Sequence, residues 1–273
     1  MVSPSVQASP LDGVRWTVER HVGELTLAEP DTRNAFSTSL LRGVHRGLDL
    51  AQQNPEVRVL LILAEGPHFS AGADLKSLMQ AHAHDEETLV AHAQPIADLF
   101  RRVGDFPKPV VVGIQGAAIG GGFGLACAAD LVVAASNARF SCPEVRLGLF
   151  PFLLMPALRK ALGDRRALQL ALTGEELNAE QALAAGVVGD VVAPSSLDAQ
   201  ARALAQQVAR ASPRALDLGM RAFRATTGHP WEQALQTQLR LRSRCLRGTD
   251  VREGVSAFLE KREPQWAPRQ PTG

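Results

Sequence analysis

The stretches HFSAGADLKSL (residues 68–78) and QGAAIGGGFGLA (residues 115–126) each lie where an apolar strand is expected to end and a helix to begin. The strands are predicted by VRVLLILA (57–64) and VVVGI (110–114), which are apolar at nearly every position. A turn from strand to helix leaves the first helical N–H groups without partners, and the helix dipole adds partial positive charge there. If the two turns meet, they offer two N–H groups to one oxygen, which is the arrangement of an oxyanion hole.

Simpler interpretations of each turn stay open at this stage. Gly72 allows a tight turn, and the glycines at 120–122 allow a helix to pack closely on a strand. A loop that binds nucleotide phosphates is disfavoured, because no Gly-Lys-Ser/Thr follows the glycines. The dinucleotide fingerprint also fails, since Leu125 stands where its third glycine should be.

Strand and helix patterns alternate through the first two thirds of the chain. Strands that alternate with helices predict an α/β core with parallel strand pairing. Besides the two strands above, the patterns predict a hairpin of strands 14–19 and 24–28 around residues 21–23, a helix capped by Ser37 that runs to about Gln53, helices at 74–80, 85–103 and 122–129, and a strand at 131–134.

The pattern changes at Asn178, which is expected to cap a helix at 179–185. A short strand follows at 187–192, and the rest predicts helices at 197–211, 213–227, 230–247 and 251–260. The apolar faces of these helices must pack on the core or on another subunit, which favours an oligomer. The chain is thus expected to divide into a disordered N-terminal tail (1–12), an α/β core (13–196) and a helical C-terminal region (197–273).

Composition argues against several classes of function. The chain has 29 basic and 28 acidic residues and a net charge of +1, so no overall field attracts nucleic acid or an anionic membrane. The most apolar stretch, 109–135, contains six glycines, Gln115 and Asp130, whereas a membrane span needs roughly 20 unbroken apolar residues. The few cysteines lack metal-ligand spacing, and the N-terminus lacks the features of a signal peptide. These features predict a cytoplasmic protein.

Six segments of the sequence form an ordered set: PDTRNAFS (30–37), FSAGADLKSL (69–78), QGAAIGGGFGLACAADLVVA (115–134), ARFSCPEVRLGL (138–149), LTGEELNAEQALAAGVVGDVV (172–192) and REGVSAFLEKREPQW (252–266). Together they resemble the enoyl-CoA hydratase/isomerase (crotonase) superfamily, and the resemblance extends over residues 14–266. It implies a crotonase-like core of repeated ββα units wound into a spiral, a helical C-terminal trimerisation region, and homotrimers that often pair into hexamers. It also implies an acyl-CoA substrate, with coenzyme A as part of the thioester and no separate cofactor.

The resemblance also implies the residues of the site. The oxyanion donors would be the backbone N–H groups of Ala73 and Gly121. The substrate-binding positions that it implies are Ala71, Asp74 and Leu75 on the pantetheine and adenine side, Arg33 and Lys261 near the CoA phosphates, and Gly120, Gly124 and Phe152 around the thioester and acyl group.

One departure from the family pattern bears on the reaction. The family's hydratases use two glutamates that face the C2–C3 bond of the substrate; this chain keeps Glu144 and has Gly124 at the other position. Burial beside apolar neighbours would raise the pKa of Glu144 toward the range of a general base. One carboxylate suffices to move a proton from C2 to C4, whereas hydration also requires an activated water. Isomerisation of the double bond is therefore favoured, and a single-glutamate hydratase or a catalytically weak acyl-CoA-binding oligomer are the alternatives.

Three further features carry less weight. The run PFLLMP (151–156) resembles the Pro-Phe step of some isomerases in the superfamily, but ordinary core packing explains it equally well. His82, His84 and His92 lack the spacing of metal ligands, so no metal site is expected, and they fit a flap beside the acyl pocket better. RNA binding, a side role of one branch of the superfamily, is disfavoured by the balanced charge.

Overall fold

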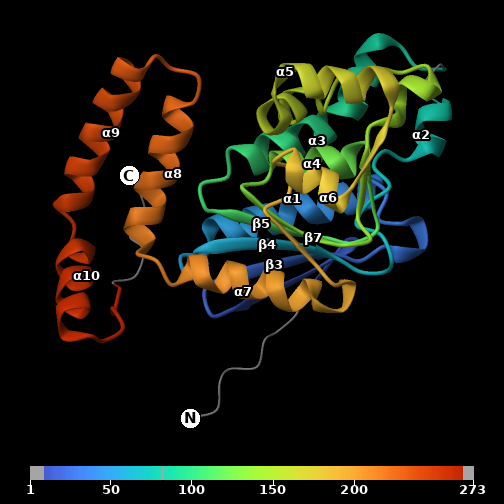
Figure 1. The fold of residues 1–273 in the computed structure, drawn as a ribbon. Coiled ribbons are helices and arrows are strands. Elements are labelled where there is room, and N and C mark those ends of the chain that lie inside the picture. Colours follow the sequence, from blue (N-terminus) through green and yellow to red (C-terminus); the bar gives the residue numbers. More distant parts are fainter. Residues whose placement is uncertain (1–8, 81–82, 267–273) are drawn as a thin grey trace.

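The computed structural model describes residues 9–80 and 83–266, and its central layer is a seven-stranded sheet (Figure 1). The strand order is β1-β2-β3-β4-β5-β7-β10. The first three strands pair antiparallel, and every pair from β3 to β10 is parallel, which confirms the predicted α/β core. The strands are β1 (Ser9–Leu11), β2 (Val14–Glu19), β3 (Val22–Leu27), β4 (Val59–Ala64), β5 (Val110–Ile114), β7 (Leu131–Ala135) and β10 (Asp190–Val192).

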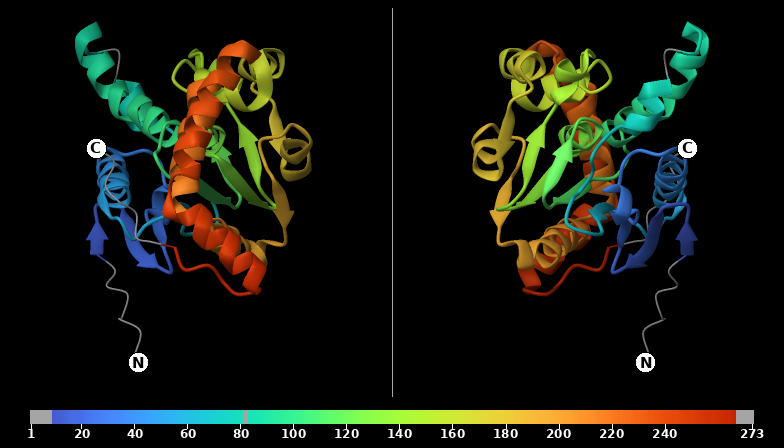
Figure 2. Two further views of the ribbon diagram at one scale, coloured as in Figure 1. Left: turned by 90° about the vertical axis from the view of Figure 1, so that its left-hand side faces the viewer. Right: turned by 90° about the vertical axis from the view of Figure 1, so that its right-hand side faces the viewer.

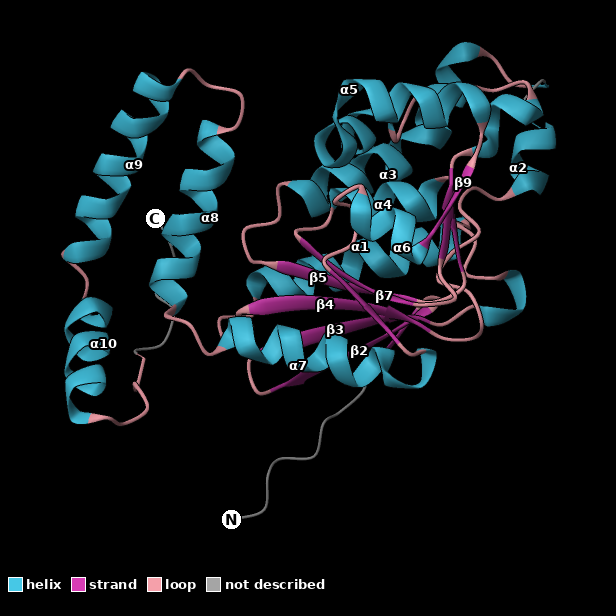
Figure 3. Cartoon of the chain, viewed as in Figure 1, coloured by secondary structure: helices cyan, strands magenta, loops and turns pink. Residues whose placement is uncertain are grey.

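Helices cover both faces of this sheet (Figures 1 and 3). Helices α1 (Thr38–Gln53), α3 (Glu86–Gly104) and α4 (Gly121–Ala128) lie on one face, and α7 (Leu197–Ala209) lies on the other. Because both faces are covered, β4 and β5 are buried at every position, as parallel strands usually are. The other helices of the core are α2 (Leu75–Gln80), α5 (Met155–Thr173) and α6 (Ala179–Ala184).

A second, three-stranded sheet positions the site and was not predicted from the sequence. Its strands are β6 (Ala117–Ile119), β8 (Arg139–Ser141) and β9 (Glu176–Asn178), in the order β6-β8-β9. Each has only three residues, too few for a recognisable apolar and polar alternation. Strand β6 leads into α4, and β8 leads into the next segment that carries a candidate site residue, so this sheet sets how the two lie relative to each other.

Several predicted boundaries differ from the structure. The N-terminal hairpin turns at Arg20 and His21 (φ 46° and 67°) rather than at residues 21–23. Gly23 lies inside β3, where a side chain would overlap the ring of Trp16. Ser9–Leu11 pairs with β2, so strand structure begins within the predicted disordered tail, whose residues 1–8 lie outside the described chain. A three-residue edge strand gives no periodic signal, and the short β10 likewise covers only the end of the predicted strand 187–192.

The helical C-terminal region projects from the core as an arm, residues 213–260 (Figures 1 and 2). It consists of α8 (Pro213–Thr226), α9 (Trp231–Leu246) and α10 (Thr249–Glu260). No residue of α9 is buried. The arm therefore has an apolar surface that the described residues leave uncovered. The exposed apolar side chains on it are Phe223, Trp231, Leu235, Leu239, Leu246, Val255, Phe258 and Leu259.

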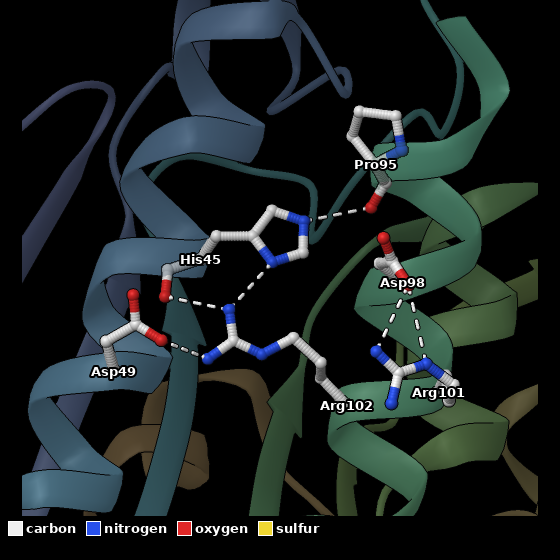
Figure 4. A network of polar contacts seen from close by, with 6 residues as sticks. All are labelled: His45, Asp49, Pro95, Asp98, Arg101 and Arg102. Carbon is white, nitrogen blue, oxygen red and sulfur yellow. Dashed lines mark hydrogen bonds and ion pairs between the residues drawn. The ribbon is translucent and has the colours of Figure 1, made fainter. Parts of the chain in front are cut away.

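Polar contacts tie α3 to α1 (Figure 4). Arg102 donates to the carbonyl oxygen (3.2 Å) and to Nδ1 (3.1 Å) of His45, and also to Oδ1 of Asp49 (2.5 Å). Since arginine can only donate, Nδ1 accepts and the proton of the neutral imidazole lies on Nε2. Nε2 donates to the carbonyl oxygen of Pro95 at 2.9 Å. The second half of α3 is thus held against α1 at two points.

Candidate active site

The two glycine turns lie against each other. Ser70 of the first turn forms a parallel bridge with Ala118, and its carbonyl accepts from the N–H of Ile119 (3.0 Å). At Gly72 the φ of +78° favours glycine, and a Cβ atom there would stand only 2.8 Å from the backbone nitrogen of Gly121. Glycine at this position therefore allows the backbone of one turn to approach the backbone of the other, as the oxyanion-hole hypothesis requires.

In the first turn, the backbone N–H of Ala73 is left available. The two N–H groups before it are used: Ala71 donates to the carbonyl of Arg33 (2.9 Å), and Gly72 donates to Oγ of Ser70 (3.1 Å). Within the described part of the chain, the N–H of Ala73 has no acceptor. It can therefore bind a ligand oxygen.

The second turn leaves the N–H of Gly121 available in the same way. Gly120, with φ +50°, donates its N–H to the carbonyl of Ser141 (2.8 Å), which ties the turn to β8. Gly121 is the first residue of α4, and no acceptor in the described chain binds its N–H. The first N–H groups of a helix have no partner inside the helix and carry its partial positive charge. Two available donors thus belong to turns that are in backbone contact.

The carboxyl group of Glu144 lies beside the second turn. Glu144 belongs to the short 3₁₀ segment Pro143–Leu147 that follows β8, and a Cβ atom at Gly120 would stand 2.8 Å from its Oε1. Its Oε2 is buried and has no hydrogen-bond partner among the described residues. Burial raises the pKa of Glu144 above the ordinary value, and its own backbone N–H partly opposes this shift. A carboxyl group with a buried oxygen that has no hydrogen-bond partner is suited to exchanging a proton with a ligand.

The space over Gly124, where hydratases of the superfamily carry their other glutamate, is filled. Gly124 lies one turn beyond Gly120, because its N–H donates to the Gly120 carbonyl (2.9 Å). A Cβ atom at Gly124 would stand 2.8 Å from Cβ of Leu154 and 2.8 Å from Cζ of Phe100, closer than Cβ atoms approach in real proteins. Residue 124 therefore has no room for a carboxylate.

The other predicted binding residues lie around the first turn and before α5. Asp74 and Leu75 follow the first turn, and Leu75 opens α2 with an exposed side chain. The backbone carbonyl of Arg33 is bound to the first turn, because it accepts a hydrogen bond from the N–H of Ala71. Phe152 lies in the loop before α5, is 68% exposed, and has its ring 5.2 Å from that of Phe150. Its side chain is therefore not part of the core.

Lys261 does not join these residues within one chain. It follows α10 at the end of the arm, which projects from the side of the core opposite α2 (Figures 1 and 2). Arg33 and Lys261, both expected near the CoA phosphates, are therefore not brought together within one chain. A recess of about 710 Å³ lies between the sheet and α7. Gly72, Gly120 and Gly121 do not line it, and its two arginines are paired, Arg202 with Glu24 (2.7 Å) and Arg15 with Glu65.

Two buried polar residues that hold the first turn were missed in the sequence. Asn34 is completely buried; its Nδ2 donates to the carbonyls of Glu65 (3.0 Å) and His68 (3.1 Å), and its Oδ1 accepts from the N–H of Glu29 (2.9 Å). Oγ of Ser70 donates to the carbonyl of Asn34 (2.7 Å). Asparagine in a left-handed turn, here at φ +51°, is the signal that could have identified this support.

The groups considered for other chemistry do not form a metal site in the described chain. No set of three potential metal ligands occurs in residues 9–80 and 83–266. His84 and His92 lie with ring centroids 5.7 Å apart, and His82 falls outside the described residues. All three cysteines are unpaired. None of the helices in the described ranges has the length and apolar character needed to cross a membrane.

A sequence profile of the enoyl-CoA hydratase/isomerase family matches residues 17–269. The chain belongs to this family. Solved structures agree: a crotonase-type enoyl-CoA hydratase/isomerase from Legionella pneumophila has a TM-score of 0.89 and 31% identity, covering 94% of this chain and 100% of that one. An enoyl-CoA hydratase from Shewanella pealeana has a TM-score of 0.87 and 32% identity, covering 94% and 96%. The crotonase fold with C-terminal helices, expected from the sequence, is thereby confirmed.

Members of the enoyl-CoA hydratase/isomerase family with known names differ in their reactions. The carnitinyl-CoA dehydratase of Salmonella typhimurium is 35% identical and covers 90% of this chain and 95% of its own length. A trans-2-decenoyl-[acyl-carrier-protein] isomerase of Streptococcus mutans is 32% identical and covers 93% and 97%. The protein is thus an enzyme of the enoyl-CoA hydratase/isomerase family that acts on acyl-CoA. Relatives in this family thus include both an isomerase and a dehydratase.

Proposed function

We propose that the protein isomerises the double bond of a 3-enoyl-CoA to the 2-position, with Glu144 as the only acid/base group. One observation supports this choice: the carboxyl group of Glu144, whose Oε2 has no hydrogen-bond partner in the described chain, lies beside Gly120, while Phe100 and Leu154 fill the space where a carboxylate at position 124 would stand. Position 124 therefore supplies no second acid/base group, and the proton transfers are assigned to Glu144.

The proposed reaction needs one proton and no water. Glu144 removes a proton from C2, and the electrons of that C–H bond delocalise over C2 to C4 and onto the thioester oxygen. The N–H groups of Ala73 and Gly121 stabilise the negative charge on that oxygen, a contribution of about 3–4 kcal/mol per donor in comparable sites. Glu144 then returns the proton at C4, which leaves the double bond between C2 and C3. The raised pKa of Glu144 favours both proton transfers.

Hydration of a 2-enoyl-CoA is the second candidate, because a hydratase from Shewanella pealeana is among the similar solved structures. Hydration requires a group to deprotonate water at C3 and a group to protonate C2. With Glu144 alone, a hydratase would lack a contribution of about 10²–10⁴-fold that one positioned acid/base group typically makes. The isomerase from Streptococcus mutans shows that relatives at this level of identity include isomerases.

For substrate binding, we assign the CoA moiety to the side of the first turn. Ala71, Asp74 and Leu75 follow one another there, and Arg33 is bound to the same turn through its carbonyl. Lys261 can reach the phosphates only from a second copy, because the arm points away from the site of its own chain. The uncovered apolar surface of the arm supports such an assembly, which we take to be a homotrimer or a dimer of trimers.

Separate assays with 3-enoyl-CoA and 2-enoyl-CoA test the proposed function. Products are resolved by chromatography so that 2-enoyl-CoA and 3-hydroxyacyl-CoA are counted independently. Conversion of 3-enoyl-CoA without a 3-hydroxy product supports isomerisation. Hydration of 2-enoyl-CoA at a comparable rate would favour the hydratase function. If neither substrate is converted, the protein binds acyl-CoA without catalysing either reaction. Glu144→Gln should abolish turnover while CoA thioesters still raise its thermal stability.

A further inference from the structure

The side chains over Gly124 form a wall that comes from two distant parts of the chain. Phe100 belongs to α3, and Leu154 immediately precedes α5; they are 6% and 4% exposed. Both reach the same point, since a Cβ atom at Gly124 would stand 2.8 Å from each. This wall, Phe100 and Leu154, lies one helical turn beyond Gly120, the residue beside the Glu144 carboxyl group.

The two wall residues block the space in different ways. At Leu154 the close atom is Cβ, whose position follows the backbone. At Phe100 the close atoms are Cζ and Cε1 at the far end of the ring, 2.8 and 3.1 Å from the same point. The volume in which a longer side chain at Gly124 would have to extend is therefore occupied by the aromatic ring, and a smaller residue in place of Phe100 would vacate it.

Polar contacts flank Phe100 along α3. Arg102, two residues further along α3, binds His45 and Asp49, and Pro95, five residues earlier, accepts from His45 (Figure 4). These contacts tie the part of α3 that carries Phe100 to α1.

From this packing we infer that Phe100 is the residue that determines the reaction class. It occupies the volume that a second carboxylate and its water would need, so all proton transfer is left to Glu144. The inference rests on the proposed function and specifies why the site isomerises rather than hydrates. Glycine at position 124 is then a consequence of the ring of Phe100 together with Cβ of Leu154, and replacing the glycine alone does not create a hydratase.

A packing experiment tests the wall independently of activity. Gly124→Ala is measured by thermal unfolding in the wild type and in Phe100→Leu. Overpacking should lower the Tm of the wild type by about 2–10 °C, and the loss should fall by about half when the ring is absent. Gly122→Ala is the matched control, because its Cβ would meet Ser70 and not Phe100. The Tm loss of Gly122→Ala should therefore be the same in the wild type and in Phe100→Leu. Equal losses for Gly124→Ala in both backgrounds would overturn the inference.

A second experiment tests the reaction class. Gly124→Glu alone should unfold or remain inactive as a hydratase. Phe100→Ala combined with Gly124→Glu should form 3-hydroxyacyl-CoA from 2-enoyl-CoA about 10-fold or more above the wild type. A folded double variant with the products of the wild type, or hydration by folded Gly124→Glu alone, would overturn the inference. If the double variant does not fold, the packing experiment decides. Failure of the wild type to isomerise would instead reject the proposed function. The difference between the Tm losses that Gly124→Ala causes in the two backgrounds would still test the packing of Phe100 against position 124.

Discussion

The carboxyl group of Glu144 lies beside Gly120, where a Cβ atom would stand 2.8 Å from Oε1. Gly120 precedes Gly121, whose N–H has no acceptor in the described chain, so the proposed acid lies one residue of backbone from a proposed oxyanion donor. The short second sheet maintains this proximity, because the N–H of Gly120 donates to Ser141 of β8 (2.8 Å) and Glu144 follows β8. A backbone hydrogen bond thus ties the turn of Gly120 to the strand that leads to Glu144.

Glu144→Gln should make the ligand-free protein more stable at neutral pH. Burial raises the folded-state pKa of Glu144, so folding favours the protonated form and the ionised form is destabilising. We expect a gain of about 1 kcal/mol, the lower end of the cost of an unpaired buried polar group, and hence a Tm higher by about 2–4 °C.

The pH dependence of this gain supplies the control. Below the unfolded-state pKa of Glu144, the carboxyl group is protonated in both the folded and the unfolded wild type, so wild type and Glu144→Gln should differ little. The difference should grow as the pH rises from the unfolded to the folded pKa and stay constant above it. Thermal unfolding of both proteins across this range measures it. If Glu144→Gln is less stable than the wild type at neutral pH, this would contradict the burial of Glu144 Oε2 without a hydrogen-bond partner.

Gly72→Ala should disable the oxyanion site. The Cβ atom would lie 2.8 Å from the backbone nitrogen of Gly121, and the φ of +78° adds strain of about 1–2 kcal/mol. Because the added atom separates the two turns, we expect kcat/KM to fall by at least about 100-fold, as when one oxyanion donor is removed.

Gly186→Ala is the matched control for Gly72→Ala. Gly186 has nearly the same φ, +80°, but a Cβ atom added there would have no heavy atom within 4 Å. The variant should lose similar backbone free energy and keep the specific activity of the wild type. Equal kinetics for Gly72→Ala and Gly186→Ala would show that contact between the turns does not matter for turnover.

Phe258→Asp should dissociate the assembly. Phe258 is 82% exposed on α10, and burying such a side chain contributes about 1.5–3 kcal/mol per subunit. We expect light scattering to give a mass near 29.2 kDa for the variant and a multiple of it for the wild type. Leu172→Asp, on α5 of the core and 58% exposed, should keep the wild-type mass. A monomeric wild type, or an assembly that survives Phe258→Asp, would contradict an interface on the arm.

The sequence predicted most of the long elements, but not the helix α5 (Met155–Thr173), which is interrupted at Gly163. Strands β4 and β5 are apolar throughout, and Ser37 caps α1 through the N–H of Leu40 as expected. It did not predict the sheet β6-β8-β9, because three-residue strands give no periodic signal. The contact of Phe100 with Gly124 could not be predicted either, since it depends on how α3 packs on α4. The same holds for Lys261, whose distance from Arg33 follows from the direction of the arm.

The most direct test of the proposal that Glu144 alone transfers the proton is a label-transfer measurement. A 3-enoyl-CoA carrying deuterium at C2 is converted in ordinary water, and NMR locates the label in the 2-enoyl-CoA product. If Glu144 alone carries the proton, a measurable fraction of the deuterium should appear at C4, no 3-hydroxyacyl-CoA should form, and Glu144→Gln should give no product. Undiminished conversion by Glu144→Gln, or a product hydroxylated at C3, would contradict a single carboxyl group working beside two backbone donors.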